Sequence, residues 1–272
     1  MFANRLSQFI RSASTAALFL SLCGHASAQQ LTATITVRDA PSAAEQMKQA
    51  IHCIDLMHQA ATQQSRFENF TAAIKNLELL QERWPSHTAP VLQSAVMIAD
   101  LALEWRTPGK AIEALQRVER RAGATPYETG VERRLANAFE MRGDATAAEI
   151  HYIAAESGIR KNTPVPEKTA ALSQFAIFYA HRANPREAVK RFHKLAVSPE
   201  LDDVQSITYH VAASEEAFQI RDDPRHTAGA EELAQLDARV SAARTHQLTP
   251  SDATFINHAA LQAQRLRDQY HP

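Results

Sequence analysis

Glycine, cysteine and excess charge of either sign are all scarce in this chain. Its 272 residues include 7 Gly and 2 Cys, and 29 Lys and Arg stand against 30 Asp and Glu. So few cysteines exclude a disulfide-stabilised scaffold. The balanced charge argues against a dedicated nucleic-acid-binding protein, because phosphate contacts need an excess of Lys and Arg. The hydrophobic content of 45% is that of a globular chain rather than a disordered one.

The motifs of the common catalytic and metal sites are also missing. No Gly-rich phosphate loop, His-Glu-x-x-His, Cys-x-x-Cys or Gly-x-Ser-x-Gly occurs in the sequence. No two histidines have the i, i+4 spacing that places two imidazoles on one face of a helix. The sequence therefore predicts a protein that is not an enzyme and that holds neither a cofactor nor a metal.

Residues 1–28 have the composition of a secretory signal peptide. Arg5 and Arg11 precede or flank an apolar stretch at residues 16–23, and the small residues at 26–28 come directly before Gln29. This order predicts cleavage near Gln29 and export to the periplasm, with secretion as the alternative. The apolar stretch is shorter than the roughly 20 residues that a membrane anchor needs. We therefore expect no integral membrane span in the mature chain.

The rest of the sequence has a helical hydrophobic period after one short predicted strand. At residues 31–37 apolar side chains alternate with threonines, which is typical of a strand. Beyond residue 42 the period is helical, and most prolines fall between the helical segments. The predicted helices cover residues 43–64, 68–83, 89–105, 109–122, 127–142, 145–157, 167–182, 186–197, 201–220, 228–246 and 250–270. The mature protein is predicted to be all-α apart from the strand.

Large and small apolar residues recur in the same order in successive pairs of these helices. In residues 127–157, Leu135 and Ala136 are followed by Phe139, Ala148 and Tyr152. The same order returns in residues 89–122 and 167–197, and a fainter copy begins at residues 60–61. Small residues of this kind let two helices approach closely. The equivalent small residues of the second helices are Ala73, Ala111, Ala148 and Ala188.

This pattern resembles the tetratricopeptide repeat, and residues 147–158 also resemble the second helix of the related Sel1-like repeat. The resemblance implies a right-handed α-solenoid of about four to five hairpins. It divides the mature chain into an extended segment at residues 29–42, repeats at 43–197, and a degenerate repeat with C-terminal capping helices at 198–272. The copies lack the full aromatic and glycine set of the repeat, and their first-helix glycine is always alanine.

The resemblance also implies that the first helix of each hairpin lines a concave groove. Arg133 and Asn137 match positions that hold a peptide carboxylate in some members, but the next hairpin has Ala170 and Gln174, so the clamp is incomplete. We expect the groove side chains to be partly solvated, so that replacing them leaves folding nearly unchanged. The predicted partner-binding residues are Asp100, Glu104, Arg133, Asn137, Glu140, Ile177 and His181.

Two charged segments offer alternative binding faces. The first is a basic stripe with a spacing of four residues on the outer face of one helix. The second is residues 200–237, where ten acidic side chains are accompanied only by Arg221 and Arg225. The carboxylate doublets in that segment, such as Glu215 and Glu216, are expected to diverge along a helix rather than to act as a catalytic pair. The basic stripe consists of Arg182, Arg186, Lys190 and Lys194.

These observations favour a non-enzymatic scaffold that binds a protein or peptide partner in the cell envelope, in an assembly or secretion machine. An inhibitor or immunity protein for a single target is the alternative, and an all-α envelope hydrolase is a further one. Cys53 is the only cysteine beyond the signal peptide. It is expected to be a small buried side chain, with a covalent partner or a nucleophilic role left open.

Overall fold

The computed structural model describes Val37 and residues 39–223 and 225–270, in which all regular secondary structure is α-helix and no strand occurs. The all-α prediction is confirmed for these residues. The predicted signal peptide lies outside them, as does the predicted strand except for Val37. No helix in the described part is long and apolar enough to cross a membrane.

The helices are α2 (Ala43–Gln59), α3 (Gln63–Arg83), α4 (Thr88–Glu104), α5 (Pro108–Gln116), α6 (Glu119–Ala122), α7 (Glu128–Met141), α8 (Ala145–Ser157), α9 (Val165–His181), α10 (Pro185–Ala196), α11 (Asp203–Ala217), α12 (Thr227–Ala243) and α13 (Pro250–Tyr270).

The chain divides into two compact units, and the boundary falls inside α9. The N-terminal unit is Gly24–Glu167, and the C-terminal unit contains Lys168–Pro272. The last boundary predicted from the sequence lies after residue 197, where the regular repeats end. The two boundaries have different meanings. The predicted boundary marks the end of a regular spacing of side chains, whereas the observed boundary separates two groups of residues that pack mainly among themselves.

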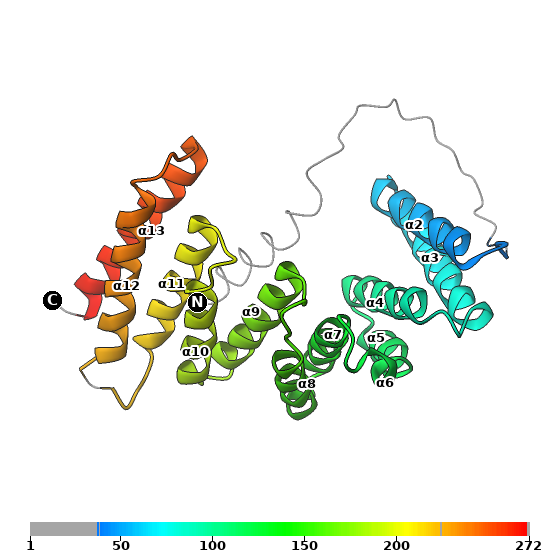
Figure 1. The fold of residues 1–272 in the computed structure, drawn as a ribbon, viewed down its shortest axis with the longest axis horizontal. Coiled ribbons are helices and arrows are strands. Elements are labelled where there is room, and N and C mark those ends of the chain that lie inside the picture. The colour runs from blue at the N-terminus through cyan, green and yellow to red at the C-terminus, as the bar shows by residue number, and fades with distance from the viewer. Residues whose placement is uncertain (1–36, 38, 224, 271–272) are drawn as a thin grey trace. The chain divides into compact units, whose positions relative to one another are not determined.

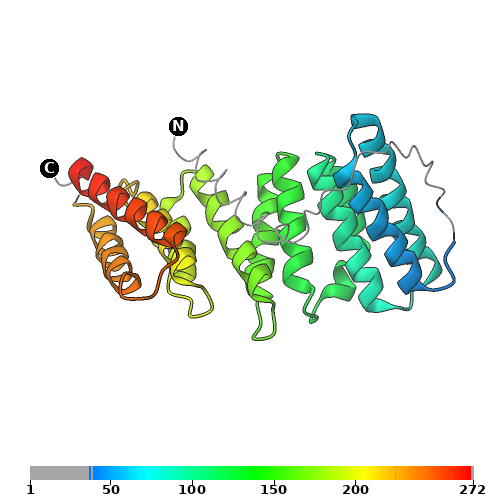
Figure 2. The same ribbon diagram turned by 90° about the horizontal axis from the view of Figure 1, so that it is seen from above.

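In the N-terminal unit, helices that follow each other along the chain pack as pairs. α2 packs on α3, α4 on α5 and α7 on α8, and further contacts join α3 to α4 and α5 to α7 (Figure 1). In the C-terminal unit α11 packs against both α10 and α12. The last helix, α13, contacts α11 and α12 and lies beside α12 in Figure 2. The predicted segment 109–122 is split, because the helix stops after Gln116 and restarts at Glu119.

Three connections between paired helices share one turn geometry. In each connection, the second residue after the end of the first helix has a positive φ. The backbone N–H of the next residue donates a hydrogen bond to the carbonyl oxygen five residues before it. This is the Schellman arrangement at a helix C-terminus. The positive-φ residues are Arg106 (53°), Gly143 (84°) and Ala183 (54°). The hydrogen bonds are Thr107 N to Ala102 O at 2.8 Å, Asp144 N to Phe139 O at 2.9 Å and Asn184 N to Tyr179 O at 3.0 Å. The repetition seen in the side chains is therefore present in the backbone as well.

The small residues that defined the repeat pattern are all in the core. Ala73, Ala111, Ala148 and Ala188 are each 0% exposed, as the close approach of paired helices requires. The first copy of the repeat pattern differs in its first helix. Ala60 and Ala61, which were predicted to lie in that helix, are in the turn between α2 and α3. The predicted register of this helix is therefore wrong.

The reason for this error is a helix cap that the period did not predict. The hydroxyl of Thr62 accepts a hydrogen bond from Ser65 N at 3.1 Å, which starts α3 several residues before the predicted position. α2 consequently ends at Gln59, and its buried small residues are Ala50 and Cys53.

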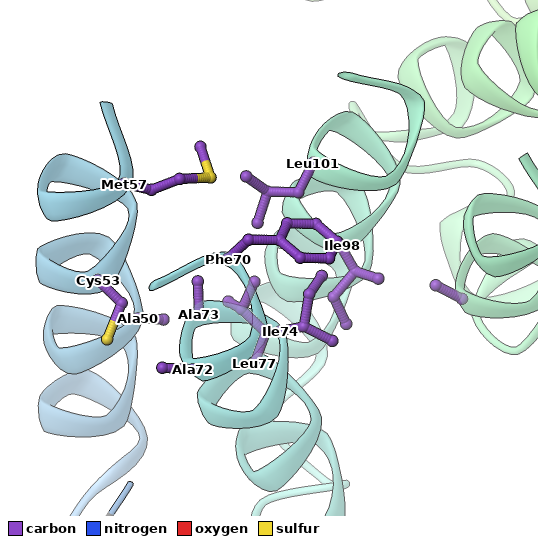
Figure 3. Packing of buried hydrophobic residues seen from close by; sticks show 11 residues of the cluster. Ala50, Cys53, Met57, Phe70, Ala72, Ala73, Ile74, Leu77, Ile98 and Leu101 are labelled. Atoms are coloured by element: carbon purple, nitrogen blue, oxygen red, sulfur yellow. The ribbon is translucent and has the colours of Figure 1, made fainter. Parts of the chain in front are cut away.

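Figure 3 shows how the first pair of helices and α4 share one core. Cys53 and Met57 on α2 face α3, whose Phe70 and Ile74 point toward Ile98 on α4. Cys53 is 2% exposed, and burial raises the pKa of its thiol. A raised pKa leaves little thiolate at neutral pH, so the environment of Cys53 is that of a core side chain rather than of a nucleophile.

One polar network is buried in this core. Gln46 Nε2 donates to Asn76 Oδ1 at 2.6 Å, and Asn76 Nδ2 donates to Ala72 O at 2.9 Å. Gln46 Oε1 accepts from Ala40 N at 2.9 Å. Because both amide side chains are satisfied, their burial does not leave an unpaired polar group between α2 and α3.

Candidate binding cleft

A cleft of about 740 Å³ lies in the C-terminal unit. Its walls come from the end of α9, the beginning of α10, the end of α11 with the turn that follows, and the last turns of α13. Apolar side chains such as Ile177, Phe192 and Leu266 line it together with charged ones. A cleft of this size with a few convergent polar groups is the usual form of a ligand site.

The cleft contains two adjacent carboxylates on α11, Glu215 and Glu216, and both are partly buried. Burial raises the pKa of Glu215, although Gln262 Nε2 on α13 donates to its Oε1 at 2.9 Å. Burial, and then the charge of Glu215, raise the pKa of Glu216 to about 7. Among the described residues, no Lys or Arg forms an ion pair with either carboxylate. Both carboxylates of the doublet, which were expected to diverge along the helix, therefore line one cleft.

One wall of the cleft is held by an aromatic stack. The rings of Tyr270 and Phe218 lie 4.5 Å apart at an angle of 7°, and Gln219 Nε2 donates to the Tyr270 hydroxyl at 3.0 Å. Gly229 on α12 packs against Phe218, and a Cβ at that position would lie 2.6 Å from the Phe218 ring. The absence of a side chain at Gly229 therefore lets Phe218 support Tyr270.

Arginines also line the cleft, at more exposed positions. Arg186 Nη2 pairs with Asp222 Oδ2 at 2.7 Å, and both side chains are largely exposed. Arg221 and Arg265 are exposed residues of the lining. The cleft thus combines exposed positive charge with partly buried carboxylates.

The predicted partner-binding residues are distributed over both units. Ile177 and His181 line the cleft. Asp100, Glu104, Arg133, Asn137 and Glu140 belong to the N-terminal unit.

Arg133 is not the solvated side chain that the sequence analysis expected. Its side chain is 10% exposed, and its Nε lies 2.5 Å from Glu167 Oε1. Arg134 contacts the same carboxylate and also pairs with Asp100, through Nε to Oδ1 at 2.7 Å and Nη2 to Oδ2 at 3.0 Å. The expectation of a solvated Arg133 is therefore wrong. We now expect its replacement to destabilise the fold, because Glu167 would lose one of its two cations.

The pKa of Glu167 reflects these contacts. Burial alone would raise it, but the charges of Arg133 and Arg134 outweigh burial and lower the pKa of Glu167 to about 2. Gly130 on α7 allows this packing, because a Cβ there would lie 3.1 Å from Arg134 Nη1 and 3.2 Å from the carboxyl carbon of Glu167.

Glu104 and Glu140, two of the other predicted residues, also have partners inside the N-terminal unit. Glu104 pairs with Arg66 at 2.5 Å, and Glu140 accepts a hydrogen bond from the hydroxyl of Tyr152 at 2.9 Å. Asn137 is partly buried. These contacts tie the first helices to neighbouring helices, so the side chains have structural contacts in addition to any part in binding.

The predicted basic stripe is shorter than expected. Arg186, Lys190 and Lys194 lie on α10, but α9 ends at His181 and α10 begins at Pro185, so Arg182 lies in the turn between them. Its guanidinium lies 5.3 Å from the ring centroid of Phe178. The stripe on one helix is thus formed by three of the four predicted residues.

The acidic segment 200–237 is partly neutralised within the C-terminal unit. Glu200 pairs with Lys168 at 2.7 Å, Asp203 pairs with Arg239 at 2.7 Å, and Asp237 pairs with Arg267. Because these cations come from other segments of the chain, the segment is less negative in the fold than in the sequence. Glu215 and Glu216 are the members of the segment that combine partial burial with a raised pKa.

Comparison with known proteins gave no relatives. No family model, curated protein or solved structure matched the chain.

Most of the cleft was not predicted as a site from the sequence. The carboxylate doublet was rejected as a catalytic pair, and Gln262, Arg265 and Tyr270 were not predicted to line a site. These side chains come from α13, about fifty residues after Glu215, so no local pattern links them to α11. Gln262 and Tyr270 lie at helical spacing from the apolar Leu266, so the hydrophobic period gave no sign that they line a site.

Proposed function

We propose that the protein is a non-enzymatic helical-repeat scaffold of the tetratricopeptide type, exported to the periplasm after removal of residues 1–28. It would bind a protein or peptide partner of the cell envelope. The repeat assignment is supported by the shared turn at Arg106, Gly143 and Ala183 and by the complete burial of the repeated alanines. Export is supported by the order of features in the signal sequence.

The observation that carries the binding function is the pair of carboxylates in the cleft of the C-terminal unit. Burying Glu215 and Glu216 side by side without a cation is unfavourable, as the raised pKa values of both groups reflect. A ligand cation in the cleft would offset that cost. A Lys or Arg side chain of a peptide fits this role, since its aliphatic part can pack on Ile177 and Leu266 while its charge reaches the carboxylates.

The proposed test measures binding of short labelled peptides that differ only in one central residue, Lys, Gln or Glu. The Lys peptide should bind about tenfold more tightly than the Gln peptide, which corresponds to about 1.4 kcal/mol. Glu215→Gln combined with Glu216→Gln should remove this preference. Glu231→Gln, an exposed acidic residue outside the cleft lining, serves as the matched control.

The pH dependence of binding gives an independent check. Because the pKa of Glu216 is about 7, the carboxylate gains its charge as the pH rises through neutrality. Binding of the Lys peptide should therefore strengthen between pH 6 and 8, while binding of the Gln peptide should change little. A Lys preference that is absent, or that survives the double substitution, would contradict the proposal.

A hydrolase acting in the same cleft is the second candidate. A carboxyl group with a pKa near neutrality is suited to general acid catalysis, and Glu216 has that property. The two candidates differ in what Glu216→Gln removes. If the protein is a scaffold, the wild type shows no turnover and the Glu216→Gln variant binds its ligand more weakly. If the protein is a hydrolase, the wild type releases products and the variant does not.

A further inference from the structure

Three side chains of metal-binding type, from different helices, converge in the N-terminal unit. They are Glu119 on α6, Glu132 on α7 and His151 on α8. One ligand atom from each lies within 4.8 Å of the other two. His151 Nδ1 is 2.7 Å from Glu132 Oε2. The sequence did not predict this group, because its members are separated by a helix or a turn and match no local spacing.

Two of the three side chains are held in place before any ion arrives. The His151 ring stacks on Phe139, with ring centroids 5.1 Å apart and an angle of 4° between the planes. The side chains of His151 and Glu132 are 15% and 13% exposed. A ligand whose rotamer is already fixed loses little entropy when it binds a metal, so this arrangement is favourable for binding.

The charges of the group are not balanced by the protein. Among the described residues, no Lys or Arg forms an ion pair with Glu119 or Glu132. The nearby Arg117 pairs with Glu113, and Arg121 donates to Pro85 O at 2.9 Å. Even a protonated His151 would neutralise only one of the two carboxylates. The contact between Glu132 and His151 is sufficient for a structural role and does not need Glu119. The position of Glu119 beside them therefore requires a separate explanation.

We propose that Glu119, Glu132 and His151 bind a divalent first-row transition metal such as Zn²⁺. One imidazole nitrogen with two carboxylate oxygens suits such an ion better than Mg²⁺ or Ca²⁺, which prefer oxygen ligands alone. Three protein ligands leave a coordination position for water. Ligand atoms about 2.1 Å from a tetrahedral ion are about 3.4 Å apart. His151 Nδ1 and Glu132 Oε2, which lie 2.7 Å apart, would therefore separate slightly on binding, and Glu119 would complete the ligand set.

This inference does not depend on the proposed function, because it concerns other residues and needs no peptide ligand.

The test is calorimetric titration of the full chain, stripped with a chelator, with Zn²⁺, Mn²⁺ and Mg²⁺ in turn. The wild type should bind one equivalent of Zn²⁺ saturably, Mn²⁺ more weakly according to the order of metal affinities, and Mg²⁺ not measurably. Glu119→Gln should weaken Zn²⁺ binding by at least about tenfold. It should not lower the melting temperature of the metal-free protein, because Glu119 forms no ion pair within the described residues.

Two further variants separate this site from metal binding elsewhere on the chain. Glu113→Gln changes an exposed carboxylate of the preceding helix and should bind Zn²⁺ like the wild type. His151→Asn should also lose the site, but it removes the stacking on Phe139 as well, so Glu119→Gln is the decisive variant. The proposal is overturned if the wild type shows no saturable Zn²⁺ binding, or if Glu119→Gln binds Zn²⁺ as tightly as the wild type does.

Discussion

The N-terminal and C-terminal units contain partly buried glutamates with opposite properties. In the N-terminal unit Glu167 lies against Arg133 and Arg134, and its pKa is lowered to about 2. In the C-terminal unit Glu216 lies beside another carboxylate without a cation, and its pKa is raised to about 7. Burial favours a higher pKa in both places, so the difference comes from the neighbouring charges. The first glutamate is compensated inside the protein, whereas the second can be compensated by a ligand.

The two carboxylates should affect stability in different pH ranges. Glu167 has a folded-state pKa below its ordinary value of 4.5. Its contribution is therefore present above pH 4.5 and is lost as the pH falls toward 2. Glu216 has a folded-state pKa above 4.5. Its contribution is present below pH 4.5 and is lost as the pH rises through 7.

The largest effect is expected from Glu167→Gln. This change removes the negative charge between two arginines and should lower the free energy of unfolding at pH 7 by about 3 kcal/mol. The loss should become smaller as the pH falls from 4.5 toward 2, because the wild-type carboxylate is then protonated as well. Chemical denaturation at a series of pH values measures both effects. Glu113→Gln is the control, and a loss for Glu167→Gln that does not depend on pH would contradict the role of the two arginines.

A smaller effect of the opposite sign is expected from Glu216→Gln. At pH 8 the variant should be more stable than the wild type by about 1 kcal/mol, because it removes a charge from a partly buried position. At pH 5 the two proteins should unfold alike, since the wild-type side chain is then largely protonated. The same denaturation series provides the measurement. If Glu216→Gln is destabilising at pH 8, the carboxylate has a stabilising partner and the contrast between the units fails.

The smallest effect concerns the turn that both units share. Arg106 in the N-terminal unit and Ala183 in the C-terminal unit have positive φ values, which glycine adopts without steric cost. Arg106→Gly and Ala183→Gly should each change stability by about 1 kcal/mol or less, in the stabilising direction. Gly143→Ala should be destabilising by a similar amount. Thermal melts of the three variants test whether the turns are equivalent, and a clear destabilisation by Ala183→Gly would show that they are not.

Most of the helical content could be predicted because its causes are local. The hydrophobic period and the prolines predicted α7, α8 and α13 to within a residue or two of their observed ends. The first turn was misplaced, because the cap at Thr62 interrupts a helix whose composition would allow it to continue. The turns at Arg106 and Ala183 could not be predicted either, since neither residue is typical of a positive φ.

The candidate sites were much less accessible to prediction. Arg133 was identified as polar, but its partner Glu167 belongs to the next pair of helices, and only packing brings the two together. Glu215 and Glu216 were noticed as a doublet, yet their cleft exists because α13 returns to lie against α11. A sequence pattern describes which face of a helix is buried. It does not describe which distant side chain lies opposite.

The burial of Cys53 gives the protein a reporter of its own local opening. Cys53 is the only cysteine after residue 23, and it is enclosed between α2 and α3. A thiol-specific dye can reach the sulfur only when these helices separate. The labelling rate therefore measures how often that pair opens, without an engineered probe. Compared with the rate of global unfolding, it would show whether the start of the chain unfolds together with the rest of its unit or ahead of it.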